Sequence, residues 1–256
     1  MPEFEQLAKN VAHEAGAVML RHFGLSVAHT FKADRSPLTR ADREINDLVL
    51  KRIGEAYPEH SLIGEEGSRI TGSEFSWIFD PVDGTQNFLR GVPVNVFSIA
   101  LAKDGKPILG VVYDPHQKRL YRATKGGGAY LNDEPIRTAS HTELAGSFIE
   151  ADGLREFKDM NFIETLTKEK ARFLSYGSTT YAQMLVASGQ IDAAIFPLPG
   201  RPWDSAAAKI IVEEAGGIVT DLQGKEQRYD MNIGGTVSAG NRELHERLLR
   251  VVAGSL

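Results

Sequence analysis

Three groups of carboxylates stand out in this sequence because each follows a short run of residues typical of a β-strand. They are Glu65-Glu66 in LIGEEG, Asp80 with Asp83 in WIFDPVDGTQNF, and Asp204 in PWDSAAAKIIVEEAGG. Side chains at strand ends project into the crevice of an α/β sheet, where ligands bind. Carboxylates crowded there would repel one another and resist ionisation unless a cation lay between them. The pattern therefore predicts a site for a hard cation such as Mg²⁺.

The segment DPVDGT adds a place for an anion. Pro81 restricts the backbone of Asp80 and cannot continue a helix, so we predict that Asp80 and Asp83 lie on a fixed turn leaving a strand. Such rigidity suits Mg²⁺, which demands near-octahedral oxygen geometry. Gly84-Thr85 follows, and Gln86–Arg90 can begin a helix whose first N–H groups cradle an anion. Together these features indicate one site for a phosphate bridged by metal.

Each of these acids has an ordinary structural explanation when it is considered alone. Glu65-Glu66 is compatible with a solvated loop, Asp80 with a turn, and Asp204 with the acidic first turn of a helix. Thr39 and Asp42 form a capping box that opens a helix. The functional interpretation is preferred because these acids occur together with DPVDGT.

The elements that would position these residues are predicted from hydrophobic periodicity. We expect an N-terminal helix and a second helix from Thr39 to about Ala56. Further helices are expected at 156–169, 179–188, 205–215 and 243–252. Strands are expected at 61–63, 76–79, 94–103, 107–113, 120–123, 129–131, 147–150, 171–174, 193–196, 218–220 and 236–239. The order predicts one layered domain over residues 1–256, with an α+β half (1–140) carrying most metal ligands and an α/β half (141–256) carrying Asp204 and the substrate loops.

Composition excludes several classes of protein. The chain has 256 residues, of which 42% are hydrophobic and 25% charged, and it contains no cysteine, which excludes disulfides, thiolate zinc sites and cysteine nucleophiles. The net charge is −5 without a dense Lys/Arg run, so we expect no nucleic acid as the main partner. No apolar run approaches the ~20 residues that span a bilayer. Acidic residues stand where a signal peptide would carry lysines, so we expect no membrane partner and a cytoplasmic location.

The segments GEEG, DPVDGTQNF and WDSAAAKIIVEEAGG resemble, in order and spacing, the motifs of the inositol monophosphatase family of Mg²⁺-dependent, lithium-sensitive phosphatases. SPLTRADRE (36–44) and YGSTTYAQMLVASGQIDA (176–193) match as well, so the resemblance covers nearly the whole chain. It implies a layered α-β-α-β-α sandwich of the sugar-phosphatase type, a homodimer, and hydrolysis of a small phosphorylated metabolite, foremost inositol 1-phosphate.

The resemblance also implies a role for individual residues. Glu65, Asp80 and the Val82 carbonyl would hold one Mg²⁺, Asp80, Asp83 and Asp204 a second, and a third, weaker ion would lie near Glu65. The pair that would orient and activate the attacking water, together with Glu65, is Asp42 and Thr85. The backbone amides of Gly84 and Thr85 would bind phosphate, and the predicted substrate-binding residues are Asp83, Gly84, Thr85, Gly177, Ser178, Thr179, Arg201 and Asp204.

The alcohol part of the substrate stays open. Inositol-preferring members usually carry a glutamate six positions before the tryptophan of WD, where this chain has Pro197. Arg201 is either a plain loop residue or a ligand for a second phosphate, as in fructose 1,6-bisphosphate. SPLTRAD and GKPILGVVYDP resemble the adenosine 3′,5′-bisphosphate branch, and NFLRGVP resembles histidinol-phosphate phosphatases. Those branches tend to have Lys where this chain has Gln86.

Two functions outside this enzyme class are compatible with parts of the sequence. A regulatory binding protein on the same fold is disfavoured because every expected metal ligand is present. A nucleotide-binding module using Gly126-Gly127-Gly128 is weaker still, because these glycines lack GxGxxG spacing and a turn between strands explains them.

Overall fold

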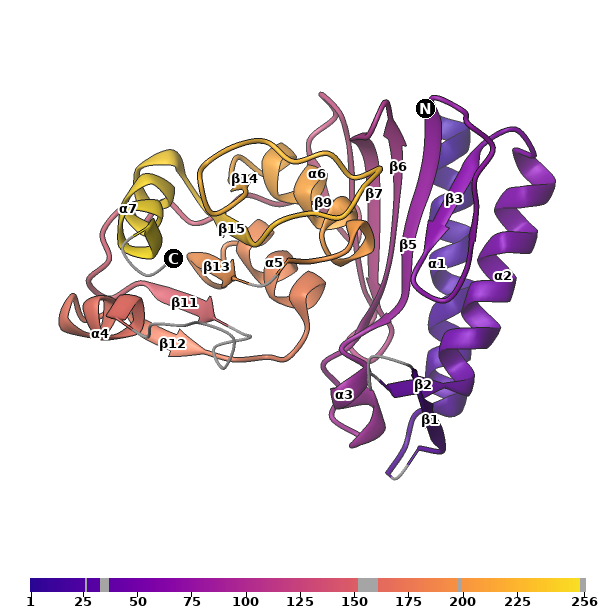
Figure 1. The fold of residues 1–256 in the computed structure, drawn as a ribbon, viewed down its shortest axis with the longest axis horizontal. Coiled ribbons are helices and arrows are strands. Elements are labelled where there is room, and N and C mark those ends of the chain that lie inside the picture. Colours follow the sequence, from indigo (N-terminus) through magenta and orange to yellow (C-terminus); the bar gives the residue numbers. More distant parts are fainter. Residues whose placement is uncertain (26, 33–36, 152–160, 198, 254–256) are drawn as a thin grey trace.

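The structure, a computed structural model, describes residues 1–25, 27–32, 37–151, 161–197 and 199–253, which form a mixture of helices and strands (Figure 1). The helices are α1 (Pro2–His22), α2 (Arg40–Ala56), α3 (Thr85–Leu89), α4 (Asn161–Lys168), α5 (Thr179–Ala187), the 3₁₀ helix η2 (Pro202–Asp204), α6 (Ala206–Glu214) and α7 (Arg242–Ala253). None of the described helices is both long and apolar enough to cross a membrane.

The larger sheet has eight strands in the order β10-β9-β8-β7-β6-β5-β3-β4 and is antiparallel except where β3 pairs with β5. The smaller sheet has five strands in the order β12-β11-β13-β15-β14, with parallel pairing between β12, β11 and β13. A separate two-stranded sheet pairs β1 with β2. The strand bounds are β1 (His29–Phe31), β2 (Pro37–Thr39), β3 (Ser61–Gly64), β4 (Ser68–Arg69), β5 (Phe75–Asp83), β6 (Val96–Lys103), β7 (Lys106–Asp114), β8 (Arg119–Thr124), β9 (Ala129–Leu131), β10 (Glu134–Pro135), β11 (Phe148–Ala151), β12 (Arg172–Leu174), β13 (Ala193–Phe196), β14 (Ile218–Thr220) and β15 (Thr236–Ala239).

The layers follow the order α-β-α-β-α, which confirms the predicted fold class (Figure 1). Helices α1 and α2 cover one face of the larger sheet, α5 and α6 lie between the two sheets, and α4 and α7 cover the outer face of the smaller sheet. Alternation along β5 shows how a buried strand serves two layers, because Trp77 and Phe79 pack toward α1 and α2 while Ile78 packs toward α5 and α6. Gly110 permits α6 to approach β7 closely, since a Cβ there would lie 2.6 Å from the Ala207 carbonyl oxygen.

One predicted feature of the backbone is wrong. Asp80 and Asp83 do not lie on a turn that leaves a strand, because β5 continues through Asp83 with a register shift between them. Asp80 lies opposite Ser98, whereas Asp83 lies opposite Val96. Pro81 has no N–H for the ladder, and a bulge accommodates it without ending the strand.

Other predictions are confirmed in their local detail. The Thr39–Asp42 capping box opens α2, and the triple glycine forms a turn between β8 and β9. In that turn the N–H groups of Gly126 and Gly128 donate to the Glu214 carboxylate. Positions 156–160 of the helix expected at 156–169 lie outside the described residues, as does Ser36 of the matched segment 36–44.

Candidate active site

The Asp80 side chain is held in the bulge of β5 by the backbone of the same strand. Its Oδ1 accepts a hydrogen bond from the Val82 N–H at 2.9 Å, and its side chain is buried. The Thr85 hydroxyl donates to the Val82 carbonyl oxygen at 2.9 Å. The bulge therefore brings one carboxylate, one main-chain carbonyl and one hydroxyl into a single short segment.

Asp83 meets the beginning of α5 from the other half of the chain. Its Oδ2 accepts hydrogen bonds from the Ser178 hydroxyl at 2.7 Å and the Thr180 N–H at 2.6 Å. Gly84 makes this approach possible, because its backbone is left-handed (φ 89°) and a Cβ there would lie 3.1 Å from the Ser178 Cβ. The first turns of α3 and α5 consequently converge beside Asp83.

Asp204 lies in η2, immediately before α6. Its Oδ2 accepts a hydrogen bond from the Arg201 N–H at 2.7 Å. The Arg201 guanidinium donates in turn to the Asn232 Oδ1 at 3.0 Å, and no carboxylate among the described residues forms an ion pair with it. Arg201 is therefore an exposed cation tethered close to Asp204.

Asp42 combines capping with an unpartnered oxygen. Its Oδ2 accepts from the Thr39 N–H at 2.7 Å and from the Thr39 hydroxyl at 2.6 Å, whereas its Oδ1 is buried without a hydrogen-bond partner. Asp42 and Thr85, expected to act as a pair, share no hydrogen bond here, since the Thr85 hydroxyl donates to Val82. A buried, unpaired carboxylate oxygen is costly and points to a missing partner.

Glu65 and Glu66, just after β3, both contact Lys32. The Lys32 ammonium lies 2.6 Å from Glu65 Oε1 and 2.5 Å from Glu66 Oε1. These hydrogen bonds raise the pKa of Lys32, against the lowering effect of burial. The Lys32 ammonium therefore lies beside Glu65, where the resemblance implies a Mg²⁺ ion.

The carboxylates influence one another's ionisation. Burial, together with the charges of Glu65, Asp83 and Asp204, raises the pKa of Asp80 well above its ordinary value. Burial likewise raises the pKa of Asp204 to about 7 and that of Asp42 to about 6. It also raises the pKa of Asp83, although the hydrogen bonds from Ser178 and Thr180 oppose this effect. Acids that lie close enough to suppress each other's ionisation form one cluster.

The cluster fits a hard divalent cation by the chemistry of its donors. Carboxylate and carbonyl oxygens are the ligands that Mg²⁺ prefers. A bound cation would give the unpartnered Asp42 Oδ1 a partner and would offset the repulsion between carboxylates that helps to raise the pKa of Asp80. Within the described ranges, no group of three or more His, Asp or Glu side chains is arranged so that it could hold a metal ion. Glu65 contacts Lys32 instead.

Three residues of this region were missed from the sequence. Lys32 had no signal as a lone lysine, and Thr180 lies inside the matched segment 176–193 without drawing attention. Asn87 lies in DPVDGTQNF, and its Nδ2 donates to the Tyr176 carbonyl at 2.6 Å and the Val94 carbonyl at 3.0 Å. It therefore ties α3 to the segment that leads into α5.

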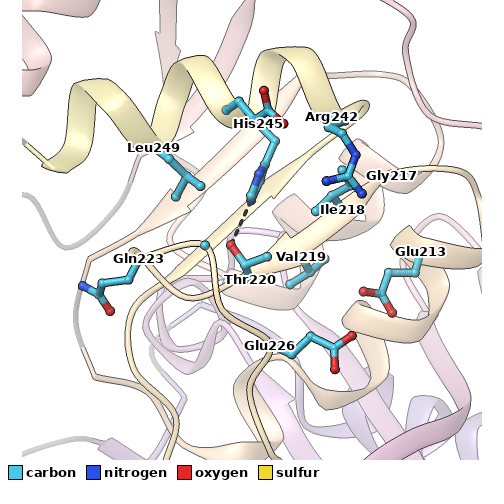
Figure 2. Close-up of a pocket in the computed structure, with 12 residues that line it drawn as sticks. Glu213, Gly217, Ile218, Val219, Thr220, Gln223, Glu226, Arg242, His245 and Leu249 are labelled. Atoms are coloured by element: carbon cyan, nitrogen blue, oxygen red, sulfur yellow. Dashed lines mark hydrogen bonds between the residues drawn. The ribbon is translucent and has the colours of Figure 1, made fainter.

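A cavity among the described residues lies elsewhere, beside β14 and α7 (Figure 2). Its volume is about 620 Å³, and none of the predicted site residues lines it. His245 Nε2 lies 2.9 Å from the Thr220 hydroxyl, while Glu213 and Glu226 face the opposite side (Figure 2). We refer to this space as the β14 cavity.

Comparison with known proteins agrees with this geometry. The sequence profile described as "Inositol monophosphatase family" matches residues 1–255. The chain belongs to the inositol monophosphatase family. A Chlorobaculum parvum protein named histidinol-phosphatase is 36% identical over 241 residues, covering 92% of each chain. A Xylella fastidiosa protein named Nus factor SuhB is 33% identical over 222 residues, covering 84% of this chain and 80% of the relative. The solved structure of a Thermotoga maritima IMPase has a TM-score of 0.88 and 30% identity, covering 100% of this chain and 98% of that one.

Membership in the inositol monophosphatase family places the protein in a reaction class. It is a phosphatase that hydrolyses phosphoric monoesters. Inositol monophosphatase family members are metal-dependent and act on small phosphorylated substrates.

Proposed function

We propose that the protein is a Mg²⁺-dependent phosphomonoesterase for a small polyol or sugar phosphate, with inositol 1-phosphate as the first substrate. One observation shared by four carboxylates carries this proposal. In each, one oxygen is held by hydrogen bonds, while no described residue donates to the other; these are Asp42, Asp80, Asp83 and Asp204. Oriented oxygens with free lone pairs are what a Mg²⁺ site requires.

Two to three Mg²⁺ ions would be held by the residues that the resemblance names. Glu65, Asp80 and the Val82 carbonyl would hold the first, Asp80, Asp83 and Asp204 the second, and Glu65 would contribute to a weaker third. When bound, these ions supply the positive charge that phosphoryl transfer needs on its attacking and leaving sides.

The protein's own groups would then position water and phosphate. The Thr85 hydroxyl donates its hydrogen bond to the Val82 carbonyl oxygen, so its lone pairs are free to accept a hydrogen bond from the attacking water. Glu65 and Asp42 are the carboxylates assigned to orient and deprotonate that water. The Asn87 and Phe88 N–H groups close onto the Gly84 carbonyl, which leaves the N–H groups of Gly84 and Thr85 available to phosphate oxygens.

Recognition of the alcohol would involve the first turn of α5 and Arg201. Thr179 is the first residue of α5, and among the described residues its N–H has no acceptor, so it can donate to a substrate hydroxyl. Gly177 and Ser178 shape the backbone of this turn. Arg201, tethered by Asn232 and without an ion-pair partner in the described ranges, can bind a second anionic or polar group.

Histidinol phosphate is the second candidate substrate. Pro197 provides no carboxylate for sugar hydroxyls, and the Chlorobaculum parvum relative is named histidinol-phosphatase. Loss of such a charge-assisted hydrogen bond costs about 1.5–3 kcal/mol, which is enough to change substrate preference.

The deciding experiment measures phosphate release with Mg²⁺, with and without Li⁺. The four substrates are inositol 1-phosphate, histidinol phosphate, fructose 1,6-bisphosphate and adenosine 3′,5′-bisphosphate. If kcat/KM is highest for inositol 1-phosphate, the proposal is supported. If it is highest for another of the four esters, that ester is the substrate. If a bisphosphate dominates, Arg201→Gln should raise its KM. No Mg²⁺-dependent release from any of the four would contradict the proposal.

We also propose a cytoplasmic homodimer, following the resemblance, and light scattering of the purified protein tests the dimer. A regulatory role is the alternative of a different class, since the Xylella fastidiosa relative is named Nus factor SuhB. A cellular phenotype that survives Asp83→Asn while phosphatase activity is lost would favour that role.

A further inference from the structure

The first turn of α5 touches both halves of the candidate active site. Asp83 belongs to the larger sheet, at the end of β5, whereas Asp204 belongs to η2 and precedes α6. Helix α5 lies between the two sheets (Figure 1), and β5 and η2 also contact each other directly. Its position allows one short turn to hydrogen-bond to both aspartates.

Toward Asp83, the contacts converge on a single oxygen. Oδ2 accepts from the Ser178 hydroxyl at 2.7 Å, from the Thr180 N–H at 2.6 Å and from the Tyr181 N–H at 3.4 Å. No described residue donates to the other oxygen, Oδ1. The turn therefore decides which oxygen of Asp83 remains for a ligand.

Toward Asp204, the contact is with the main chain. The Thr180 hydroxyl, whose residue is fully buried, donates to the Asp204 carbonyl oxygen at 3.2 Å. One turn later, Gln183 exchanges hydrogen bonds of 2.9 and 3.1 Å with the Ser205 hydroxyl. The Asp204 main chain and the Ser205 side chain are thus hydrogen-bonded to the same helix that donates to the Asp83 carboxylate.

We propose that the first turn of α5 is a positioning clamp that sets the separation between Asp83 and Asp204, with Ser178 and Thr180 as positioning residues. The clamp rests on the proposed metal-dependent function, in which these two aspartates hold one ion. Mg²⁺ tolerates little departure from octahedral geometry at 2.0–2.1 Å, so ligands from two separate layers need a common anchor. Partners that orient metal ligands change metal affinity by about 10–100-fold when they are removed.

The test measures Mg²⁺ binding to the metal-stripped, full-length protein by calorimetry without substrate. Ser178→Ala removes a donor to Asp83, and Thr180→Val removes the hydroxyl bond to Asp204 while keeping side-chain shape. We expect each to weaken Mg²⁺ binding about 10-fold or more, and to shift the Mg²⁺ concentration for half-maximal phosphatase activity in the same direction. Thr180→Ser, which keeps the hydroxyl, should retain the parent's Mg²⁺ affinity.

Ser188→Ala is the matched control, because the Ser188 hydroxyl donates to the Met184 carbonyl at 2.8 Å at the opposite end of α5. It should change the melting temperature in EDTA as much as Ser178→Ala but leave Mg²⁺ affinity unchanged. Folded Ser178→Ala and Thr180→Val variants with the parent's Mg²⁺ affinity would overturn the clamp and leave the proposed function standing. A parent that binds no Mg²⁺ and releases no phosphate contradicts the proposed function and the clamp together.

Discussion

Acidic side chains gather in two regions of this protein, in the candidate active site and around the β14 cavity. In the candidate active site, Asp42 and Asp80 are 1% and 3% exposed, and neither forms an ion pair with a described lysine or arginine. In the β14 cavity, Glu213 pairs with Lys209, and the Glu226 side chain is 73% exposed. Asp42 and Asp80 are buried without a counter-charge, which favours binding of a cation, whereas Glu213 is paired and Glu226 is solvated. Glu65 differs from both groups, because it is a proposed metal ligand that contacts Lys32. The burial and ion pairing of acidic side chains therefore indicate a metal site better than the number of these side chains does.

The largest expected difference between the two regions is in catalysis. Asp83→Asn should lower phosphatase kcat/KM by at least about 100-fold, because it removes a proposed metal ligand rather than a residue that merely supports one. Circular dichroism and melting temperature should show that the fold is retained. Glu226→Gln is the matched change in the β14 cavity and should leave kcat/KM as in the parent. Comparable activity of the two variants would be inconsistent with the assigned site.

The second-largest expected difference between the two regions is in the effect of Mg²⁺ on stability. At a Mg²⁺ concentration 100 times the dissociation constant, binding should stabilise the folded protein by about 2.7 kcal/mol relative to EDTA. Urea denaturation with and without Mg²⁺ measures this. Asp204→Asn should reduce the stabilisation, because Asp204 is a proposed ligand of the second ion, and Glu213→Gln should retain it. Equal Mg²⁺ stabilisation in both variants would place the ion elsewhere.

The metal-free protein should also show the active-site acids in its pH dependence. Burial raises the pKa of Asp204 to about 7, above the ordinary value of 3.8, so the folded state holds a proton that the unfolded state has released. The corresponding stability is present below about pH 4 and lost as pH rises through 7, by up to about 1.4 kcal/mol per pH unit. In EDTA, Asp204→Asn should make stability fall less steeply than in the parent between pH 4.5 and 7.5. Parallel curves would show that Asp204 is not protonated in the folded state.

The smallest effect is expected at the rim of the β14 cavity. Glu246 is exposed, and no described residue forms a hydrogen bond or ion pair with it. Glu246→Gln should therefore change the free energy of unfolding by less than about 0.5 kcal/mol and leave phosphatase activity and Mg²⁺ affinity unchanged. A clear loss of phosphatase activity would instead show that the β14 cavity contributes to catalysis.

Much of the fold could be predicted because the deciding interactions are local. The capping box of α2 joins Thr39 to Asp42, three positions further along, and β13, β14 and β15 begin and end at the predicted positions. The bulge at Pro81 was missed because a proline that removes a ladder N–H is compatible with either a turn or a bulged strand. Pairing with Val96 on β6 decides between them, and that partner lies on the next strand of the larger sheet, outside the segment that carries Pro81.

The sequence by itself determined the types and order of the acids, the glycine that permits a left-handed turn at position 84, and the family to which they belong. Tertiary structure decided which oxygen each carboxylate leaves free. The Ser178 hydroxyl and Thr180 N–H that hold Asp83 lie 95 and 97 residues away from it, and Lys32 lies 33 residues from Glu65. Side-chain hydrogen bonds across such separations form only when packed layers bring the partners together, so no local pattern of residues contains them.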